Sequence, residues 1–185
     1  MQSTIDILKT RRSVKDFNDK KVSKEDLDNI LSAAVNAPTG MNAQSPKILV
    51  IQRKDIIERF TQWNKSFYPE ELRNKLPDDF DPFYNASTLI IVLADKTYNT
   101  YIEDGSLVIG NILNAAASLG LGACWIHRAK EEFDSLQGKE LLKVWNLSEN
   151  YAGIGHVVLG YPSDDFKATE KNIKDDFVVY LDDII

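Results

Sequence analysis

Hydrophobic and polar positions along the chain follow two periodicities. A helical spacing of apolar residues predicts five helices, over residues 4–10, 22–37, 55–67, 102–120 and 138–147. Apolar runs rich in branched residues predict four strands, over residues 47–52, 88–95, 121–127 and 153–162. This order of elements predicts one sheet surrounded by helices, in a fold of either the α/β or the α+β class.

Three segments depart from a simple amphipathic pattern. Helix 102–120 is largely apolar and contains several small residues, so we expect a central, buried helix that its neighbours approach closely. Prolines and charges between residues 68 and 85 predict a long exposed loop or an irregular helix, and such segments often cover sites. The charged C-terminal segment ends in FVVYL, which we expect either to add a strand or to reach a partner.

Composition narrows the class of protein. The length of 185 residues fits a single domain spanning residues 1–185, and a hydrophobic share of 43% is typical of a globular protein. A net charge of −6 argues against a nucleic-acid partner. Cys124 is the only cysteine, so no internal disulfide can form. No signal-peptide pattern is present and the apolar runs are too short to cross a bilayer, so we expect a cytoplasmic protein without a membrane partner.

Common site motifs are missing from the chain. The glycines of GLGACW follow a helix and enter a strand, which is the reverse of a dinucleotide-binding turn. His127 and His156 stand in predicted strands without a Cys/His cluster, so we expect no metal site, and we expect His156 to be a core strand residue. We expect Cys124 to be a buried, inert thiol.

Two polar clusters remain as candidates. In RRSVKDF, residues 11–17, three cations surround Ser13, which indicates either a solvated helix end or an anion site. The segment APTGMNAQSP, residues 37–46, contains turn residues and two amides, Asn42 and Gln44. It is either a polar turn or a loop that hydrogen-bonds to the edge of a flat heterocycle.

Four segments together resemble the FMN-dependent nitroreductase family. They are RRSVKDF, APTGMNAQSPKILV, GSLVIGNILNAAASLGLGACWIHRA and GIGHVVLGYP, in the order and spacing of that family and over nearly the whole chain. The resemblance implies an α+β sandwich, with a central, mainly antiparallel sheet flanked by helices, that forms an intertwined homodimer. It also implies that FMN is reduced by NADH or NADPH and that a nitroaromatic, a quinone or a similar small aromatic acceptor is then reduced in a ping-pong reaction.

The resemblance assigns roles to the N-terminal cluster. Arg11 would pair with the FMN phosphate and Ser13 would add a hydrogen bond, while Arg12 would contact the phosphate or the ribityl chain. Lys15 would lie near the pyrimidine end of the flavin ring, where a cation stabilises the anionic reduced form. No side chain is expected to act as a catalytic acid or base, because the chemistry takes place on FMN.

Other segments would complete the pocket. The resemblance implies that the loop 38–44 contacts the flavin of the other subunit, through Pro38, Thr39, Gly40, Asn42 and Gln44. The end of strand 121–127 would lie along the flavin, through Ile126, His127 and Arg128. Lys171, which precedes an acidic pair, would contact the phosphate, and Lys167 is the alternative.

Several alternatives stay open. The chain could be a family relative that acts as a flavin reductase, an ene-reductase or a dehalogenase. It could instead be a flavin-binding carrier or sensor without turnover, or an α/β interaction domain without a cofactor. The sequence does not identify the acceptor, nor does it choose between NADH and NADPH.

Overall fold

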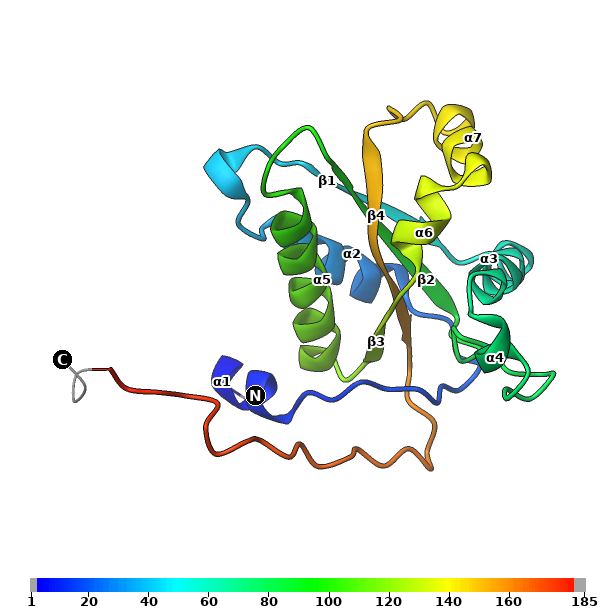
Figure 1. Ribbon diagram of the computed structural model, residues 1–185. Helices are drawn as coiled ribbons and strands as arrows, with labels where there is room; N and C mark the ends of the chain where they lie inside the picture. The colour runs from blue at the N-terminus through cyan, green and yellow to red at the C-terminus, as the bar shows by residue number, and fades with distance from the viewer. Residues whose placement is uncertain (1–2, 182–185) are drawn as a thin grey trace.

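The computed structural model describes residues 3–181 and places helices on both faces of one sheet (Figure 1). The strands are β1 (Pro46–Ile51), β2 (Thr88–Asp95), β3 (Gly122–Ile126) and β4 (Tyr151–Gly160). The helices are α1 (Thr4–Thr10), α2 (Lys24–Val35), η1 (Gly40–Asn42), α3 (Lys54–Ser66), α4 (Glu70–Arg73), α5 (Tyr101–Ser118), α6 (Ala129–Asp134) and α7 (Leu136–Val144).

The strands form a sheet in the order β1-β2-β4-β3, and every neighbouring pair is antiparallel. The central strands β2 and β4 therefore lie between β1 and β3, which are the two edges. This arrangement confirms the α+β alternative and the antiparallel sheet that the sequence predicts.

The sheet separates two hydrophobic cores because side chains alternate along each strand. In β2, Ile90 and Val92 pack in a core with α2 and α5. Leu89, Ile91 and Leu93 face the opposite way, into a core with α3, α6 and α7. All five side chains are fully buried, so the sheet has no solvent-facing side at its centre.

Each predicted helix and strand corresponds to an observed element, with ends that differ by at most three residues. His127 was expected in a strand but follows the end of β3. Helix α6 was not predicted, because six residues are too few for a helical periodicity to be recognised. The segment 68–85 contains the short helix α4 and is not exposed throughout, since Phe83 is fully buried.

Helix α5 is only partly the buried helix that its composition predicts. Val108, Ile109 and Ile112 are buried against the sheet. Ile102 and Leu107, in contrast, are 51% and 47% exposed. An apolar helix with exposed large side chains indicates a surface that is suited to a further partner.

The C-terminal segment leaves β4 at Gly160 and runs in extended form past α1 (Figure 1). An isolated β-bridge between Phe17 and Pro162, together with neighbouring hydrogen bonds, joins it to the N-terminal segment. Residues 177–181, the FVVYL segment, belong to no strand and are exposed. Among residues 3–181, no helix has the length and apolar character needed to cross a membrane.

Candidate functional site

The N-terminal segment lies beside the edge strand β3. The Val14 amide donates a hydrogen bond to the Ala123 carbonyl at 3.1 Å. The Val14 side chain packs where a Cβ at position 122 would lie, so only glycine at Gly122 allows this close approach. These contacts fix the cations of residues 11–15 next to the start and middle of β3.

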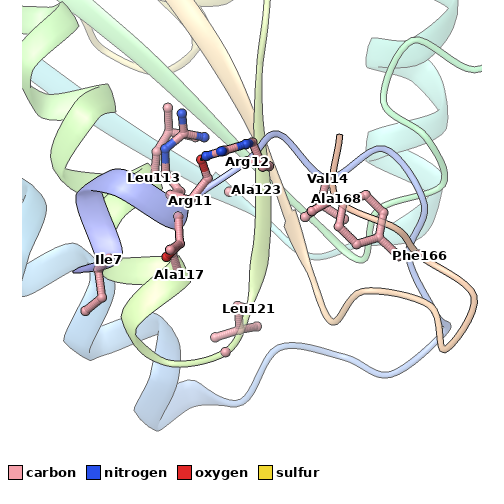
Figure 2. A pocket seen from close by; sticks show the side chains of 12 residues that line it. Ile7, Arg11, Arg12, Val14, Leu113, Ala117, Leu121, Ala123, Phe166 and Ala168 are labelled. Carbon is pink, nitrogen blue, oxygen red and sulfur yellow. The ribbon is translucent and has the colours of Figure 1, made fainter. Parts of the chain in front are cut away.

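Arg11 borders a pocket of about 220 Å³ between the end of α1, helix α5 and the returning C-terminal segment (Figure 2). Leu113 and Ala117 of α5 and Phe166 of the C-terminal segment line the same pocket. The Arg11 Nη1 atom is buried and has no hydrogen-bond partner within residues 3–181. A buried guanidinium nitrogen without an acceptor indicates a site for an anion.

Unlike Arg11, Arg12 donates its side-chain hydrogen bonds to backbone carbonyls. Its Nε atom donates to the Thr169 carbonyl at 2.9 Å, and its Nη1 atom donates to the carbonyls of Lys9 and Arg11. Arg12 therefore connects the C-terminal segment to the end of α1. We conclude that much of its hydrogen-bonding capacity is already occupied by the backbone.

The C-terminal segment that carries Lys167 and Lys171 borders the Arg11 pocket. Lys167 lies between Phe166 and Ala168, which both line the pocket, and Lys171 follows two residues after the Thr169 carbonyl that Arg12 holds. Both lysine side chains are exposed. The fold thus brings this part of the chain to the Arg11 pocket.

Ser13, Lys15 and Arg11 converge on Cys124 in β3. Burial raises the pKa of the Cys124 thiol, while a hydrogen bond with Ser13 and the charges of Lys15 and Arg11 act in the opposite direction. The raised pKa agrees with an unreactive thiol. The Lys15 Nζ atom also lies 5.8 Å from the ring centre of Tyr84, so the cation is close both to β3 and to the segment before β2.

The far end of β3 borders a larger cavity of about 780 Å³, which Trp125, His127 and Arg128 help to line. Arg128 has a left-handed backbone with φ of 84°, which is uncommon for a residue with a side chain. Its guanidinium lies 4.5 Å from the ring centre of Tyr68 and 3.3 Å from a Glu131 carboxylate oxygen. Ile126 is buried in the core with α3, so its side chain faces away from this cavity.

The loop after α2 is held by Asp104, in the first turn of α5. The Gly40 amide donates to Asp104 Oδ1 at 2.9 Å, and the Ser45 hydroxyl donates to Asp104 Oδ2 at 2.7 Å. Three residues of the loop have φ values between 51° and 54°, and these are Met41, Asn42 and Gln44. Backbone strain of this kind accumulates at functional sites, where the surrounding contacts hold it in place.

Burial alone raises the pKa of Asp104. The hydrogen bonds from Ser45, Gly40 and Thr100 together outweigh this effect, so the pKa lies below its ordinary value. Asp104 is only 1% exposed and is therefore a buried carboxylate that stabilises the loop in its charged form.

The loop and the Arg11 pocket do not meet within one chain. Asp104 holds the loop at the N-terminal end of α5, whereas Leu113 and Ala117 border the pocket nearer the other end. At a rise of 1.5 Å per residue, the positions are roughly 14–20 Å apart along the helix. The loop amides of Asn42 and Gln44 instead border a separate cavity of about 430 Å³.

Some residues at the site are not among the functional residues that the sequence predicts. Asp104 and the adjacent Glu103 are charges in a largely apolar helix, which is a signal that the sequence does contain. Met41 is 99% exposed on the strained loop. The contact between Glu132 and His156 joins residues 24 apart, and no local pattern indicates it. No cluster of three metal-binding side chains occurs within the described part of the chain.

Comparison with known proteins identifies the family. Residues 8–161 match the model of the "Nitroreductase family". The chain is 31% identical, over 172 residues, to a protein of Archaeoglobus fulgidus that carries the name NADH dehydrogenase/NAD(P)H nitroreductase, and the match covers 89% of this chain and 88% of that protein. It is 30% identical over 135 residues to the iodotyrosine deiodinase of Thermotoga neapolitana, covering 66% of this chain and 73% of that protein.

The fold agrees with these matches. The crystal structure of a nitroreductase with bound FMN from Bacteroides fragilis superimposes with a TM-score of 0.88 at 25% identity, covering 97% of this chain and 99% of that one. The chain belongs to the nitroreductase family. The class of enzyme that the sequence predicts, an oxidoreductase of this family, is confirmed.

The Asp104 contacts generate a prediction about stability. Asp104→Asn should lower the free energy of unfolding at pH 7 by about 1.5–3 kcal/mol, because charge-assisted hydrogen bonds to the loop are lost. Since the pKa of Asp104 is lowered in the folded state, its stabilisation is complete above the unfolded value near pH 4 and disappears as the pH falls through the folded value. Urea unfolding of both proteins from pH 7 downwards measures this difference.

The matched control is Asp28→Asn. Asp28 is exposed and forms an ion pair with Lys24 on the surface of α2, so its loss should change stability by less than about 0.5 kcal/mol. An Asp104→Asn difference that stays constant from pH 7 to pH 3 would contradict a stabilising charged form.

Proposed function

We propose that this protein is an FMN-dependent NAD(P)H oxidoreductase that reduces nitroaromatics, quinones or similar small aromatic acceptors by a ping-pong hydride mechanism. The observation that carries the proposal is the buried Arg11 Nη1 atom, which lacks an acceptor at the edge of a pocket. A phosphate oxygen is a suitable acceptor for a guanidinium. The family relationship makes FMN the phosphate-bearing group of choice.

The residues around Arg11 fit a phosphate. Lys167 and Lys171 are exposed cations on the segment that borders the pocket, so either can add positive charge. Arg12 contributes by holding this segment against α1, and any contact of its own to the phosphate or ribityl chain would use its remaining Nη2 atom. Ser13 adds a hydroxyl beside β3.

The rest of the cofactor would extend along β3. FMN supplies the chemistry, because a bound flavin accepts a hydride from NAD(P)H and passes it to an acceptor. Lys15, beside Cys124, places a cation near the ring, and the backbone at Ile126 together with His127 and Arg128 would border the ring's far end. The side chain of Ile126 points into the core, so its contribution would come from its backbone.

We propose an intertwined homodimer as the working form. Pro38, Thr39, Gly40, Asn42 and Gln44 would then complete the pocket of the other subunit, which accords with their distance from Arg11 in their own chain. The exposed side chains of Ile102 and Leu107 on α5 would lie in the interface. The segment 177–181 extends away from its own sheet and would cover apolar surface on the partner, for which the open edge strand β1 is one candidate.

Absorbance spectroscopy of the purified protein tests the proposed function. We expect the absorbance of bound flavin, its bleaching by NADH or NADPH without oxygen, and its recovery when a nitroaromatic or a quinone is added. Bleaching without recovery by any acceptor would favour a carrier or sensor. Recovery only with free FMN, an enone or a halogenated aromatic would favour a flavin reductase, an ene-reductase or a dehalogenase. A protein that binds no flavin would refute the proposal.

Arg11→Ala should weaken FMN binding. Loss of a charge-assisted hydrogen bond costs about 1.5–3 kcal/mol, which is roughly a ten- to hundredfold increase in the dissociation constant. Fluorescence titration of the apoprotein with FMN measures this dissociation constant. Lys9→Ala, which removes an exposed cation from the same segment, serves as the control and should bind FMN nearly as tightly as wild type. Equal affinities for Arg11→Ala and wild type would refute the phosphate role.

Lys15→Ala should lower the midpoint potential of bound FMN by a few tens of millivolts, on the order of 30 mV for a differential stabilisation of about 1.4 kcal/mol. A cation near the ring stabilises the anionic reduced flavin over the neutral oxidised form, whereas a phosphate ligand stabilises both equally. Lys20→Ala is the control, because Lys20 lies over the ring of Tyr161. An unchanged potential with weakened FMN binding would instead assign Lys15 to the phosphate.

Substitution of Phe177 and Tyr180 by aspartate should weaken dimerisation. These side chains are 75% and 77% exposed, and burying them against a partner is expected to contribute about 1.5–3 kcal/mol each. Sedimentation velocity over a range of protein concentrations should show a dimer for wild type and a monomer fraction for the variant. Leu136→Asp, on the exposed face of α7, is the control. A wild-type monomer that still holds FMN would contradict the proposed dimer.

A further inference from the structure

A buried chain of polar side chains lies behind the turn that joins β3 to α6. His156 Nε2 of β4 lies 2.6 Å from Glu132 Oε2 of α6. Asn64 Nδ2 of α3 donates to the other carboxylate oxygen of Glu132 at 2.7 Å and to the His127 carbonyl at 3.0 Å. Asn64, Glu132 and His156 are fully buried, so this polar chain ends at the backbone of the turn.

Stability alone does not account for this polar chain. The rings of Phe60 and Phe83 pack edge-on against His156, with ring centres 6.4 and 5.4 Å away, so the surroundings are apolar. Two of its polar atoms, Asn64 Oδ1 and His156 Nδ1, have no partner within residues 3–181. Buried ionisable groups of this kind are commonly no more stabilising than apolar residues of similar size. A role in specifying conformation is therefore the better explanation.

The turn is a place where conformation must be specified. Arg128 has a φ of 84°, a backbone state that is unfavourable for a residue with a Cβ. The Glu132 amide donates a hydrogen bond to the Arg128 carbonyl at 2.9 Å. Glu132 therefore closes the turn with its backbone and holds Asn64 with its side chain. On the other side, a Cβ at Gly153 would overlap the Ala129 carbonyl, which shows how closely α6 lies on β4.

The conformation of the β3–α6 turn determines where the side chains of His127 and Arg128 lie. With its carbonyl held by Asn64, His127 presents its ring to the cavity of about 780 Å³, and Arg128 presents its guanidinium there beside Tyr68. A rotation of the His127–Arg128 peptide would break the Asn64 hydrogen bond and move both side chains. The position of the cavity wall therefore depends on the hydrogen bonds of the buried polar side chains.

We propose that Asn64, Glu132 and His156 are positioning residues that hold the β3–α6 turn in its strained form and so set the wall of the flavin and acceptor site. The proposal rests on the proposed function only in placing FMN along β3. None of the three residues needs to contact FMN or the acceptor.

The test compares Asn64→Ala with Glu132→Gln and Thr88→Val. Asn64→Ala removes both hydrogen bonds of the amide. Glutamine at position 132 can still accept a hydrogen bond from Asn64 and form one with His156. Glu132→Gln should therefore preserve the arrangement of the turn. Thr88→Val is the matched control, because it removes a partly buried hydrogen bond, from Gln52 Nε2 at 3.0 Å, that has no connection to the turn.

Two measurements are made on each protein. Hydrogen exchange without FMN follows the amides of residues 127–132, and visible circular dichroism with a titration follows bound FMN. In Asn64→Ala we expect these amides to exchange about tenfold faster, the flavin dichroism to change, and the FMN dissociation constant to rise about tenfold. Glu132→Gln should resemble wild type. Thr88→Val should lose overall stability only, with both signals of the turn and the flavin unchanged.

Three results would overturn the proposal. They are wild-type exchange in Asn64→Ala, faster exchange with unchanged flavin dichroism and affinity, and a Glu132→Gln protein that is as disturbed as Asn64→Ala. If Asn64→Ala does not fold, Asn64→Ser is measured against the same outcomes. Failure of wild type to bind FMN would instead refute the proposed function, while the exchange comparison would still decide whether the polar chain holds the turn.

Discussion

The sheet is buried on both faces, and this burial determines where the other parts of the molecule can lie. Residues from Leu89 to Leu93 are all fully buried, and they alternate between two separate cores. A solvent-accessible reaction site has no room at the centre of such a sheet, where even a polar side chain such as His156 of β4 is fully buried. Polar chemistry is therefore displaced to the edge strand β3 and to the loops at the ends of the strands.

The edge of β3 is also where the two ends of the chain meet. The Phe17–Pro162 bridge and the Arg12–Thr169 hydrogen bond join the N-terminal segment to the C-terminal one. This meeting gathers cations beside β3 in a protein whose net charge is −6. Overall charge thus says little about a local site, because a few contacts between distant segments are sufficient to build an anion pocket.

Two buried carboxylates have a common arrangement. Asp104 lies in the first turn of α5 and Glu132 in the first turn of α6, where the helix dipole favours a negative charge. Each carboxylate accepts hydrogen bonds from side chains or amides of other segments, Ser45 and Gly40 in one case and Asn64 in the other. Both helices therefore hold neighbouring strained backbone in place through a buried carboxyl group in their first turn.

The helices and strands with strong local periodicity, as well as the family, could be predicted from the sequence, because these depend on patterns within short segments. The sequence also identified Arg11 and Lys15 as candidates, since they stand in one short motif. The folded structure was needed to show that Arg12 holds backbone carbonyls, that the Ile126 side chain faces the core, and which distant polar groups meet. Asp104 and Ser45 are 59 residues apart, and Glu132 and Asn64 are 68 apart. Such pairs leave no local signature, because the order of strands and the packing of helices bring them together.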